Sequence, residues 1–283
     1  MSFAPIIGQD AAISLLRRLL AADRLPHALL FVGPEGVGRH KTAIALAQAL
    51  LCSPEADAAS SGPSLFGGEE PAGPSREGPD GCGACAACRR VLAGQHADLH
   101  ILTGSGVKGD IQVEPTRELI TALQLHSVEG GAKVAIVDPA DRMNREAANT
   151  LLKTLEEPPR NTTLILVARE RSLLLPTIVS RCQVVRFGSL DRESLHRYFA
   201  TIGDQSAFSE NPEIARIAVA LSGGSIGKAL AMAEGELSSG RQALRNLLKG
   251  LERSDNEARL KWASDVADLF KQDSESFEIA FEG

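Results

Sequence analysis

The stretch over residues 133–187 constrains the fold more than any other part of the chain. It contains three short apolar runs, over 134–137, 163–168 and 183–187, each with the length of a buried strand. Between the first two runs lies an amphipathic segment that ends at consecutive prolines, which cannot continue a helix. Its apolar residues recur at helical spacing: Ala148, Leu151, Leu152 and Leu155. Short buried strands joined by such crossovers predict a parallel, doubly wound sheet.

Two further strands are predicted upstream, over 28–32 and 98–102. Amphipathic patterns also predict helices over 10–22 and 115–125, the second begun by its proline. The expected fold class is therefore α/β, with a five-stranded parallel sheet and helices on both of its faces.

A glycine-rich loop follows the predicted strand over 28–32. The sequence reads GPEGVGRHKT over 33–42 and leads into a predicted helix over 41–51. Strand, glycine loop and helix in this order are the context of a P-loop, GxxxxGK followed by Ser or Thr, whose backbone N–H groups hold phosphate. Gly33 and Gly38 align with the two glycines of that motif.

Four residues after these glycines decide whether the loop binds ATP. Arg39 stands at the P-loop lysine and His40 at the hydroxyl that holds Mg²⁺. Lys41 and Thr42 come two positions late, which on a helix is a rotation of about 200°. Imidazole is a poor replacement for the hard oxygen that Mg²⁺ prefers. We therefore expect no productive ATP binding by this degenerate P-loop, which consists of Gly33, Gly36, Gly38 and Arg39. A turn that serves packing only, or weak phosphate binding by Arg39 and the loop amides, stays open.

Four of the five cysteines have the spacing of a metal site. Cys82, Cys85 and Cys88 form two overlapping CxxC pairs, and Cys52 precedes them by a long segment. Four thiolates suit tetrahedral Zn²⁺, and because no position is left for a reacting water, the zinc is predicted to be structural. Free reduced thiols and a redox pair are the alternatives.

The segment between these cysteines has a different composition. Residues 53–81 are rich in Ala, Ser, Gly, Pro and Glu, which predicts a flexible insertion within a zinc module over 52–88. His96 and His100 follow the last cysteine closely, so a ligand role is conceivable. Since four cysteines already complete the set, we expect both histidines to be surface or packing residues.

Charge and hydropathy exclude several classes of protein. The net charge is −6, so any contact with DNA must use a local basic face or a partner. No apolar run approaches the roughly 20 residues that span a bilayer. The start, MSFAPIIGQD, lacks the basic region and apolar core of a signal peptide, so a cytoplasmic location is expected.

The sequence LLKTLEEPP, followed by a strand and then by SRC at 180–182, resembles the clamp-loader branch of the AAA+ ATPases in bacterial DNA polymerase III. The resemblance extends over most of the chain and implies an AAA+ core in which the four cysteines named above hold zinc. It also implies a hetero-oligomer with the gamma/tau ATPase subunits and delta. Through that complex the chain would act on the sliding clamp and primed DNA, with no membrane.

Hydrolysis of ATP needs an acid that holds Mg²⁺ and a neighbouring glutamate that orients the attacking water. Asp138 ends a predicted strand and suits the first role as a Walker B remnant, but Pro139 cannot perform the second. The resemblance places two sensor residues at Ala168 or Arg169 and at Gly227, where the usual side chains are missing. Altered together, these elements predict a subunit without intrinsic ATPase activity.

Arg181 of the SRC sequence is retained. The resemblance implies that it acts in trans, as an arginine finger for the γ-phosphate of ATP on a neighbouring subunit. The alternative is that Arg181 pairs with a carboxylate of its own domain, such as Glu156 or Glu157. No His and Asp constellation supports Cys182 as a nucleophile.

These features predict a non-catalytic, stator-like clamp-loader subunit that helps to load the sliding clamp on primed DNA in DNA replication. An ATP-hydrolysing subunit of the gamma/tau type is the alternative, and a zinc-module adaptor without a role at the replication fork is a third. Polymerase activity is expected only of the holoenzyme, since paired aspartates for nucleotidyl transfer are not apparent in the sequence.

The predicted domains are the AAA+ core over 1–188, a helical lid over 189–236 and the start of a C-terminal helical collar over 237–283. Helices of the last two are predicted over 191–202, 212–221, 225–236, 242–253 and 256–271. Because the resembling family has a longer collar, we expect this one to be incomplete or reduced.

Overall fold

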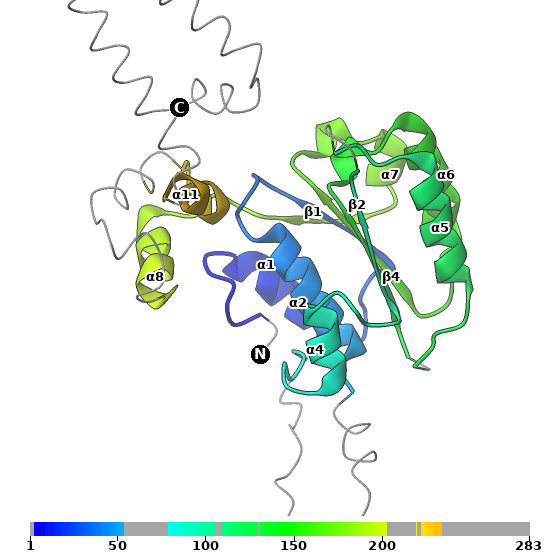
Figure 1. The fold of residues 1–283 in the computed structure, drawn as a ribbon, viewed down its shortest axis with the longest axis horizontal. Coiled ribbons are helices and arrows are strands. Elements are labelled where there is room, and N and C mark those ends of the chain that lie inside the picture. Colours follow the sequence, from blue (N-terminus) through cyan, green and yellow to red (C-terminus); the bar gives the residue numbers. More distant parts are fainter. Residues whose placement is uncertain are drawn as a thin grey trace, which may run out of the picture. The chain divides into compact units, whose positions relative to one another are not determined.

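The computed structural model describes residues 3–53, 79–105, 109–129, 131–202, 219 and 222–233. At its centre is a parallel sheet with the strand order β2-β3-β4-β1-β5 (Figure 1). The strands are β1 (Ala28–Val32), β2 (Leu99–Thr103), β3 (Lys133–Asp138), β4 (Thr162–Ala168) and β5 (Gln183–Arg186). The α/β fold class is confirmed, and each strand lies within one residue of its predicted bounds.

Helices cover both faces of the sheet (Figure 1). One side carries α1 (Asp10–Ala21), α2 (Arg39–Leu51) and α4 (Ala86–Leu92). The other side carries α5 (Val113–Gln124), α6 (Arg145–Glu156) and the short α7 (Pro176–Val179). Two 3₁₀ turns, Ala140–Arg142 and Arg171–Leu173, follow β3 and β4.

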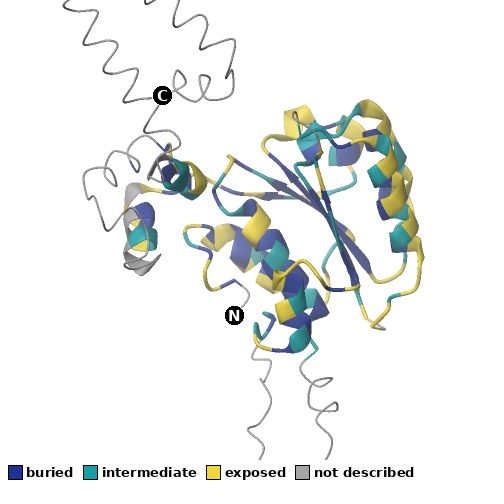
Figure 2. Cartoon of the chain, viewed as in Figure 1, coloured by how far each residue is buried: buried dark blue, intermediate teal, exposed yellow. Residues whose placement is uncertain are grey.

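The central strands are buried on both faces, as Figure 2 shows. Along β1, Ala28 and Leu30 pack against the layer that contains α5 and α6, together with Leu164 and Leu166 of β4. The alternate residues, such as Phe31, are equally buried and point to the opposite face. Strands covered on both sides are mostly apolar, which is why β3 and β4 show continuous apolar runs over 134–137 and 164–168 in the sequence.

Two helices begin earlier than the sequence predicts. The helix predicted over 41–51 begins at Arg39, because Gly38 adopts a left-handed backbone and ends the loop there. The helix predicted over 115–125 begins at Val113, so Pro115 is its third residue rather than its first. Proline is tolerated there because the first N–H groups of a helix have no partner within the helix.

The chain divides into two compact units, Met1–Ser189 and Leu190–Gly283. The described part of the second unit contains α8 (Arg192–Ile202) and α11 (Ile226–Ala233). Ser194 donates its amide to Asp191, and Lys228 donates its amide to the Ser225 hydroxyl, so each of these helices has a side-chain cap.

Several predictions from the sequence lie outside the described residues. These are most of the insertion over 53–81 and the helices over 212–221, 242–253 and 256–271. The boundaries of the core, lid and collar stay predictions for the same reason. Within the part that the structure does describe, no helix has both the length and the apolar character needed to cross a membrane.

Gln9 joins two segments that are far apart in the sequence. Its side-chain amide donates to the carbonyl oxygens of Gly188 (2.8 Å) and Val37 (3.3 Å), and its oxygen accepts from the Gly188 amide (3.2 Å). The side chain is buried, so these partners would remain without water if it were removed. Gln9 therefore ties the glycine loop to the chain that leaves β5.

We expect Gln9→Ala to lower the free energy of unfolding by about 2 kcal/mol or more, because several buried polar groups lose their partner. Urea unfolding followed by circular dichroism measures this loss. Gln124→Ala is the matched control, since Gln124 is exposed on α5 and its loss should cost less than about 0.5 kcal/mol. Equal effects of the two substitutions would contradict the role of Gln9.

Asp98 holds the loop that follows α5. Its carboxylate accepts from the amides of Val128 (2.8 Å) and Glu129 (3.0 Å) and from the hydroxyl of Ser127 (3.0 Å). Burial by itself would raise the pKa of the Asp98 carboxyl, but the hydrogen bonds outweigh burial and lower the pKa. The ionised form is therefore the one that stabilises the fold.

Asp98→Asn should lower the free energy of unfolding at pH 7 by about 1 to 3 kcal/mol. A carboxyl whose pKa is lowered in the fold contributes above its unfolded pKa of about 4, and this contribution is lost as the pH falls through the folded value. The difference between the two proteins should therefore shrink below about pH 4. Urea titrations at pH 7, 5 and 3.5 test this, and a difference that is constant with pH would contradict it.

Candidate functional site

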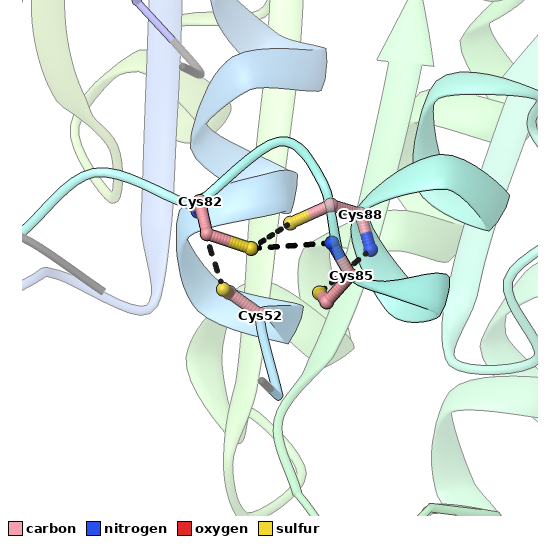
Figure 3. Close-up of side chains that lie close together, drawn as sticks. All are labelled: Cys52, Cys82, Cys85 and Cys88. Atoms are coloured by element: carbon pink, nitrogen blue, oxygen red, sulfur yellow. Dashed lines mark hydrogen bonds between the residues drawn. The ribbon is translucent and has the colours of Figure 1, made fainter. Parts of the chain in front are cut away.

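The four cysteines predicted as metal ligands lie together. Cys52 follows the last residue of α2, Cys85 caps α4, and Cys88 lies in its first turn. The four sulfur atoms are all within 4.8 Å of one another (Figure 3). A tetrahedral Zn²⁺ with Zn–S bonds of about 2.3 Å separates its sulfurs by about 3.8 Å. The four cysteines are therefore close enough to share one metal ion, and no disulfide joins them.

Backbone amides point at these sulfurs. Cys82 N–H donates to the sulfur of Cys52, Cys85 N–H to that of Cys82, and Cys88 N–H to that of Cys85, at 3.3 to 3.4 Å. Burial opposes ionisation of Cys82, but the amides of Cys85 and Ala84 outweigh it and lower the pKa of this thiol to about 7. Amides directed at sulfur thus favour the thiolate of Cys82, the form that binds metal, whereas burial raises the pKa of the Cys52 and Cys88 thiols.

The cysteine loop packs closely on α2. The Gln48 side chain donates to the carbonyl oxygen of Cys88 (3.0 Å), and a Cβ atom at Gly81 would lie 2.7 Å from the Gln48 carbonyl oxygen. His96 is not among the residues that share the cluster in the described ranges. It is buried, accepts from the Asp98 amide (3.1 Å) and lies 3.4 Å from Glu129, as a packing residue would.

The glycine loop joins β1 to α2, and its backbone requires glycine at several positions. A Cβ atom at Gly33 would lie 2.3 Å from the carbonyl oxygen of Phe187, so only glycine fits between β1 and β5 at this point. Gly36 and Gly38 have φ angles of 73° and 102°, which other residues rarely adopt. Thr42 is buried and donates to the Gly38 carbonyl oxygen (2.9 Å), so its hydroxyl bonds to its own helix.

The side chains that follow the loop are engaged within the protein. His40 Nδ1 lies 2.7 Å from Oδ2 of Asp138, the last residue of β3. Arg39 is 8% exposed, and its Nη1 atom has no hydrogen-bond partner. Burial lowers the pKa of the Arg39 guanidinium, although Asp138, Asp141 and Glu35 oppose this effect. The sequence indicated Arg39, His40 and Asp138 as residues of the nucleotide site, but it did not predict the contact between His40 and Asp138.

An ion pair lies at the end of β4. Arg169 Nε donates to Oδ2 of Asp141 (2.9 Å), and the Arg169 amide lies 3.2 Å from Oδ1 of the same carboxylate. The Asp141 side chain is fully buried, and this hydrogen bond raises the pKa of Arg169. Arg169 therefore has a structural partner at the position where the resemblance expects a sensor. The sequence DPAD, with a second carboxylate three residues after Asp138, was the signal for it.

Arg181 lies on the surface, near the end of α6. Its Nη2 atom is 2.6 Å from Oε1 of Glu156, and its Nη1 atom donates to the Thr177 carbonyl oxygen (2.9 Å). The side chains of Arg181 and Glu156 are 35% and 50% exposed, and an ion pair this exposed is worth only about 0 to 1 kcal/mol. The ion pair with Glu156 therefore restrains the Arg181 guanidinium only weakly. Burial raises the pKa of the adjacent Cys182 thiol to about 12, so this cysteine is a poor nucleophile.

Together these features define a class. A parallel sheet in the order β2-β3-β4-β1-β5, with a glycine loop after β1 and an aspartate at the carboxyl end of β3, is the core of an AAA+ P-loop protein. Ligands of such sheets bind at the carboxyl ends of the strands, which is where Asp138 and the loop lie.

Comparison with known families identifies the branch of this class. The family described as "DNA polymerase III, delta subunit" matches residues 8–65 and 72–191, more than half of the chain. The chain therefore belongs to the delta-prime family of DNA polymerase III clamp-loader subunits, which confirms the resemblance inferred from LLKTLEEPP and SRC.

Individual relatives include two kinds of subunit. DNA polymerase III subunit delta' of Bacillus subtilis is 34% identical over 190 residues, which are 66% of this chain and 50% of that protein. Subunit delta' of Escherichia coli is 32% identical over 255 residues, 85% of this chain and 68% of that protein. Subunit tau of Escherichia coli is 30% identical over 240 residues, 84% of this chain and 33% of that protein. The chain thus spans about half of the first relative and a third of the last.

Proposed function

We propose that this chain is a non-catalytic, stator-like subunit of the DNA polymerase III clamp loader. It supplies Arg181 to the ATP site of a neighbouring gamma/tau-type subunit, assembles with delta, and helps to place the sliding clamp on primed DNA. The structural role of the cysteine cluster is to hold one Zn²⁺ that secures the loop over 79–85 against α2.

The observation that supports this proposal is the contrast between two sites on one domain. At the nucleotide loop, the carboxylate suited to Mg²⁺ lies 2.7 Å from His40, and Arg39 is buried beside it. At the second site, the SRC arginine is partly exposed, and its guanidinium contacts Glu156, the Thr177 carbonyl oxygen and the Ser180 hydroxyl, all of which water or a phosphate can replace. Such a domain is poorly equipped to hydrolyse ATP and well equipped to present a guanidinium to another subunit.

An arginine supplied from outside the nucleotide site acts by electrostatics. As the γ-phosphoryl group is transferred, negative charge spreads over its oxygens and the leaving group, and a guanidinium within hydrogen-bonding distance stabilises it. Arg181 would have to leave Glu156 to reach that phosphate. A triphosphate carries more negative charge than one carboxylate, so the exchange favours the neighbour's site when it holds ATP.

The second candidate is an ATP-hydrolysing subunit of the gamma/tau type. The similarity to subunit tau over 84% of the chain favours it. Arg39, Pro139 and the absence of an arginine at Gly227 speak against it, because each removes a group used in hydrolysis. An adaptor without a role in replication is the least supported reading, since the family match covers most of the predicted core.

One pair of assays tests the proposal. The isolated chain should not turn over ATP, and the reconstituted loader should lose ATP turnover when Arg181 is replaced by alanine. Turnover by the isolated chain would favour the gamma/tau-type reading. A loader that is indifferent to Arg181→Ala would refute the role in trans.

A further inference from the structure

In the cleft, two side chains at the positions that hold Mg²⁺ in a working P-loop bond to each other. In a working P-loop, Mg²⁺ is shared between the hydroxyl after the lysine and a carboxylate at the end of a neighbouring strand. Here the two corresponding side chains bond directly, with 2.7 Å between His40 Nδ1 and Asp138 Oδ2. An ionised carboxylate accepts only, so Nδ1 is the donor and carries a proton. The imidazole nitrogen that faces Asp138 then has no lone pair for a metal, and Oδ2 of the carboxylate is engaged by His40.

The charged groups around this pair carry no excess of positive charge. Arg39 and Arg169 contribute two positive charges, and four carboxylates lie near one or both of them: Glu35, Asp138, Asp141 and Glu170. Without a divalent cation, this set offers no excess of positive charge to a triphosphate, whose binding would bring further negative charge. The carboxylates of the cleft therefore already outnumber its arginines, which disfavours a triphosphate.

The backbone of the loop, in contrast, keeps the geometry that phosphate needs. Gly33 makes the close approach to Phe187, and both Gly36 and Gly38 have positive φ angles. The N-terminus of α2 begins at Arg39 and has no side-chain cap, so its first amides are not used by a capping side chain. Amides at the start of a 13-residue helix favour an anion, as in nucleotide-binding P-loops.

We propose that His40, by bonding to Asp138, is the residue that excludes magnesium–nucleotide from this cleft, and that the loop behind it remains competent to bind. This inference deepens the proposed function and rests on its non-catalytic part. It makes a positive prediction, because Arg39→Lys and His40→Thr together convert GPEGVGRH over 33–40 into GPEGVGKT, a complete P-loop motif.

The test uses the full chain and a fluorescent ATP analogue, titrated with Mg²⁺ and with EDTA. The double variant Arg39→Lys/His40→Thr should bind the analogue about 10- to 100-fold more tightly than the natural chain, and only with Mg²⁺ present. His40→Thr alone should show part of this Mg²⁺-dependent gain. Arg39→Lys alone, which keeps the His40–Asp138 pair, is the matched control and should gain no dependence on Mg²⁺. Adding Asp138→Asn to the double variant should abolish that dependence.

Each outcome decides the matter. A double variant that binds no better than the natural chain, or equally well in EDTA, would overturn the role of His40. So would a natural chain that already binds the magnesium complex tightly. The metal content and thermal midpoint of every variant show that it is folded. If these variants show that His40 does not exclude the nucleotide, the Arg181 assays keep their meaning, because a cleft closed for another reason is still non-catalytic. ATP turnover by the natural chain, in contrast, would contradict the proposed function itself.

Discussion

Replacement of Arg181 by alanine is expected to slow ATP hydrolysis at the neighbouring site of the reconstituted clamp loader by about 10³-fold or more. An arginine that enters a phosphoryl-transfer site from another subunit contributes about 10³ to 10⁵ in rate, because it stabilises charge that exists only in the transition state. Single-turnover hydrolysis with clamp and primed DNA present measures the step at that site directly. The rate at which the clamp is loaded on DNA should decrease together with the rate of hydrolysis.

Three further variants separate a role in hydrolysis from a structural one. Arg181→Lys keeps the charge but loses the planar fork, so most of the loss should remain. Arg160→Ala removes another exposed arginine of the same domain and should leave turnover unchanged. Glu156→Gln weakens the bond that Arg181 makes within its own domain and should change the free energy of unfolding by less than about 1 kcal/mol. Full turnover with Arg181→Ala would show that the arginine serves only its own surface.

Loss of the metal is expected to have the largest effect on stability. Cys85→Ser should lower the zinc content below one equivalent and reduce the free energy of unfolding by about 4 kcal/mol, as losses of structural metals do. Serine is itself a good N-cap, so α4 keeps its cap at residue 85 and the loss reports on the metal. Elemental analysis and urea unfolding of the same samples measure both quantities.

Cys182→Ser is the matched control for metal content. Cys182 is the fifth cysteine and lies outside the cluster, so this variant should retain one equivalent of zinc. A chelator should destabilise the natural chain and leave Cys85→Ser little changed. A redox pair would behave differently, since its stability would respond to dithiothreitol and not to a chelator. Unchanged unfolding of Cys85→Ser would contradict a structural metal.

The sheet was predictable because its strands are buried on both faces. A strand covered by helices on each side has few polar positions, so β3 and β4 contain uninterrupted apolar runs over 134–137 and 164–168. Helix starts were less accurate, by two residues for α2 and α5. The start of α2 depends on the left-handed backbone of Gly38, and that of α5 on where Pro115 falls within the first turn. Neither feature changes the spacing of the apolar residues, so the sequence pattern does not show where these two helices begin.

The cysteine set and the degenerate P-loop were also visible in the sequence, since both depend on short, fixed spacings. Their partners were not. His40 and Asp138 are 98 residues apart, and Gln9 and Gly188 are 179 apart. Contacts such as His40–Asp138 depend on the order of the strands in the sheet, which sets how far the end of β3 lies from the loop after β1.

By itself, the sequence determined the class of fold, the four thiols and the substituted positions of the nucleotide loop, because each follows from local spacing and from which residues can be buried. Tertiary structure alone decided what the substituted residues do. It placed the His40 imidazole 2.7 Å from the Asp138 carboxylate, and it left the Arg181 guanidinium in contact with Glu156, the Thr177 carbonyl oxygen and the Ser180 hydroxyl. The physical reason is that the interaction between two charged side chains depends on the distance between them in space, and their separation along the chain does not give that distance.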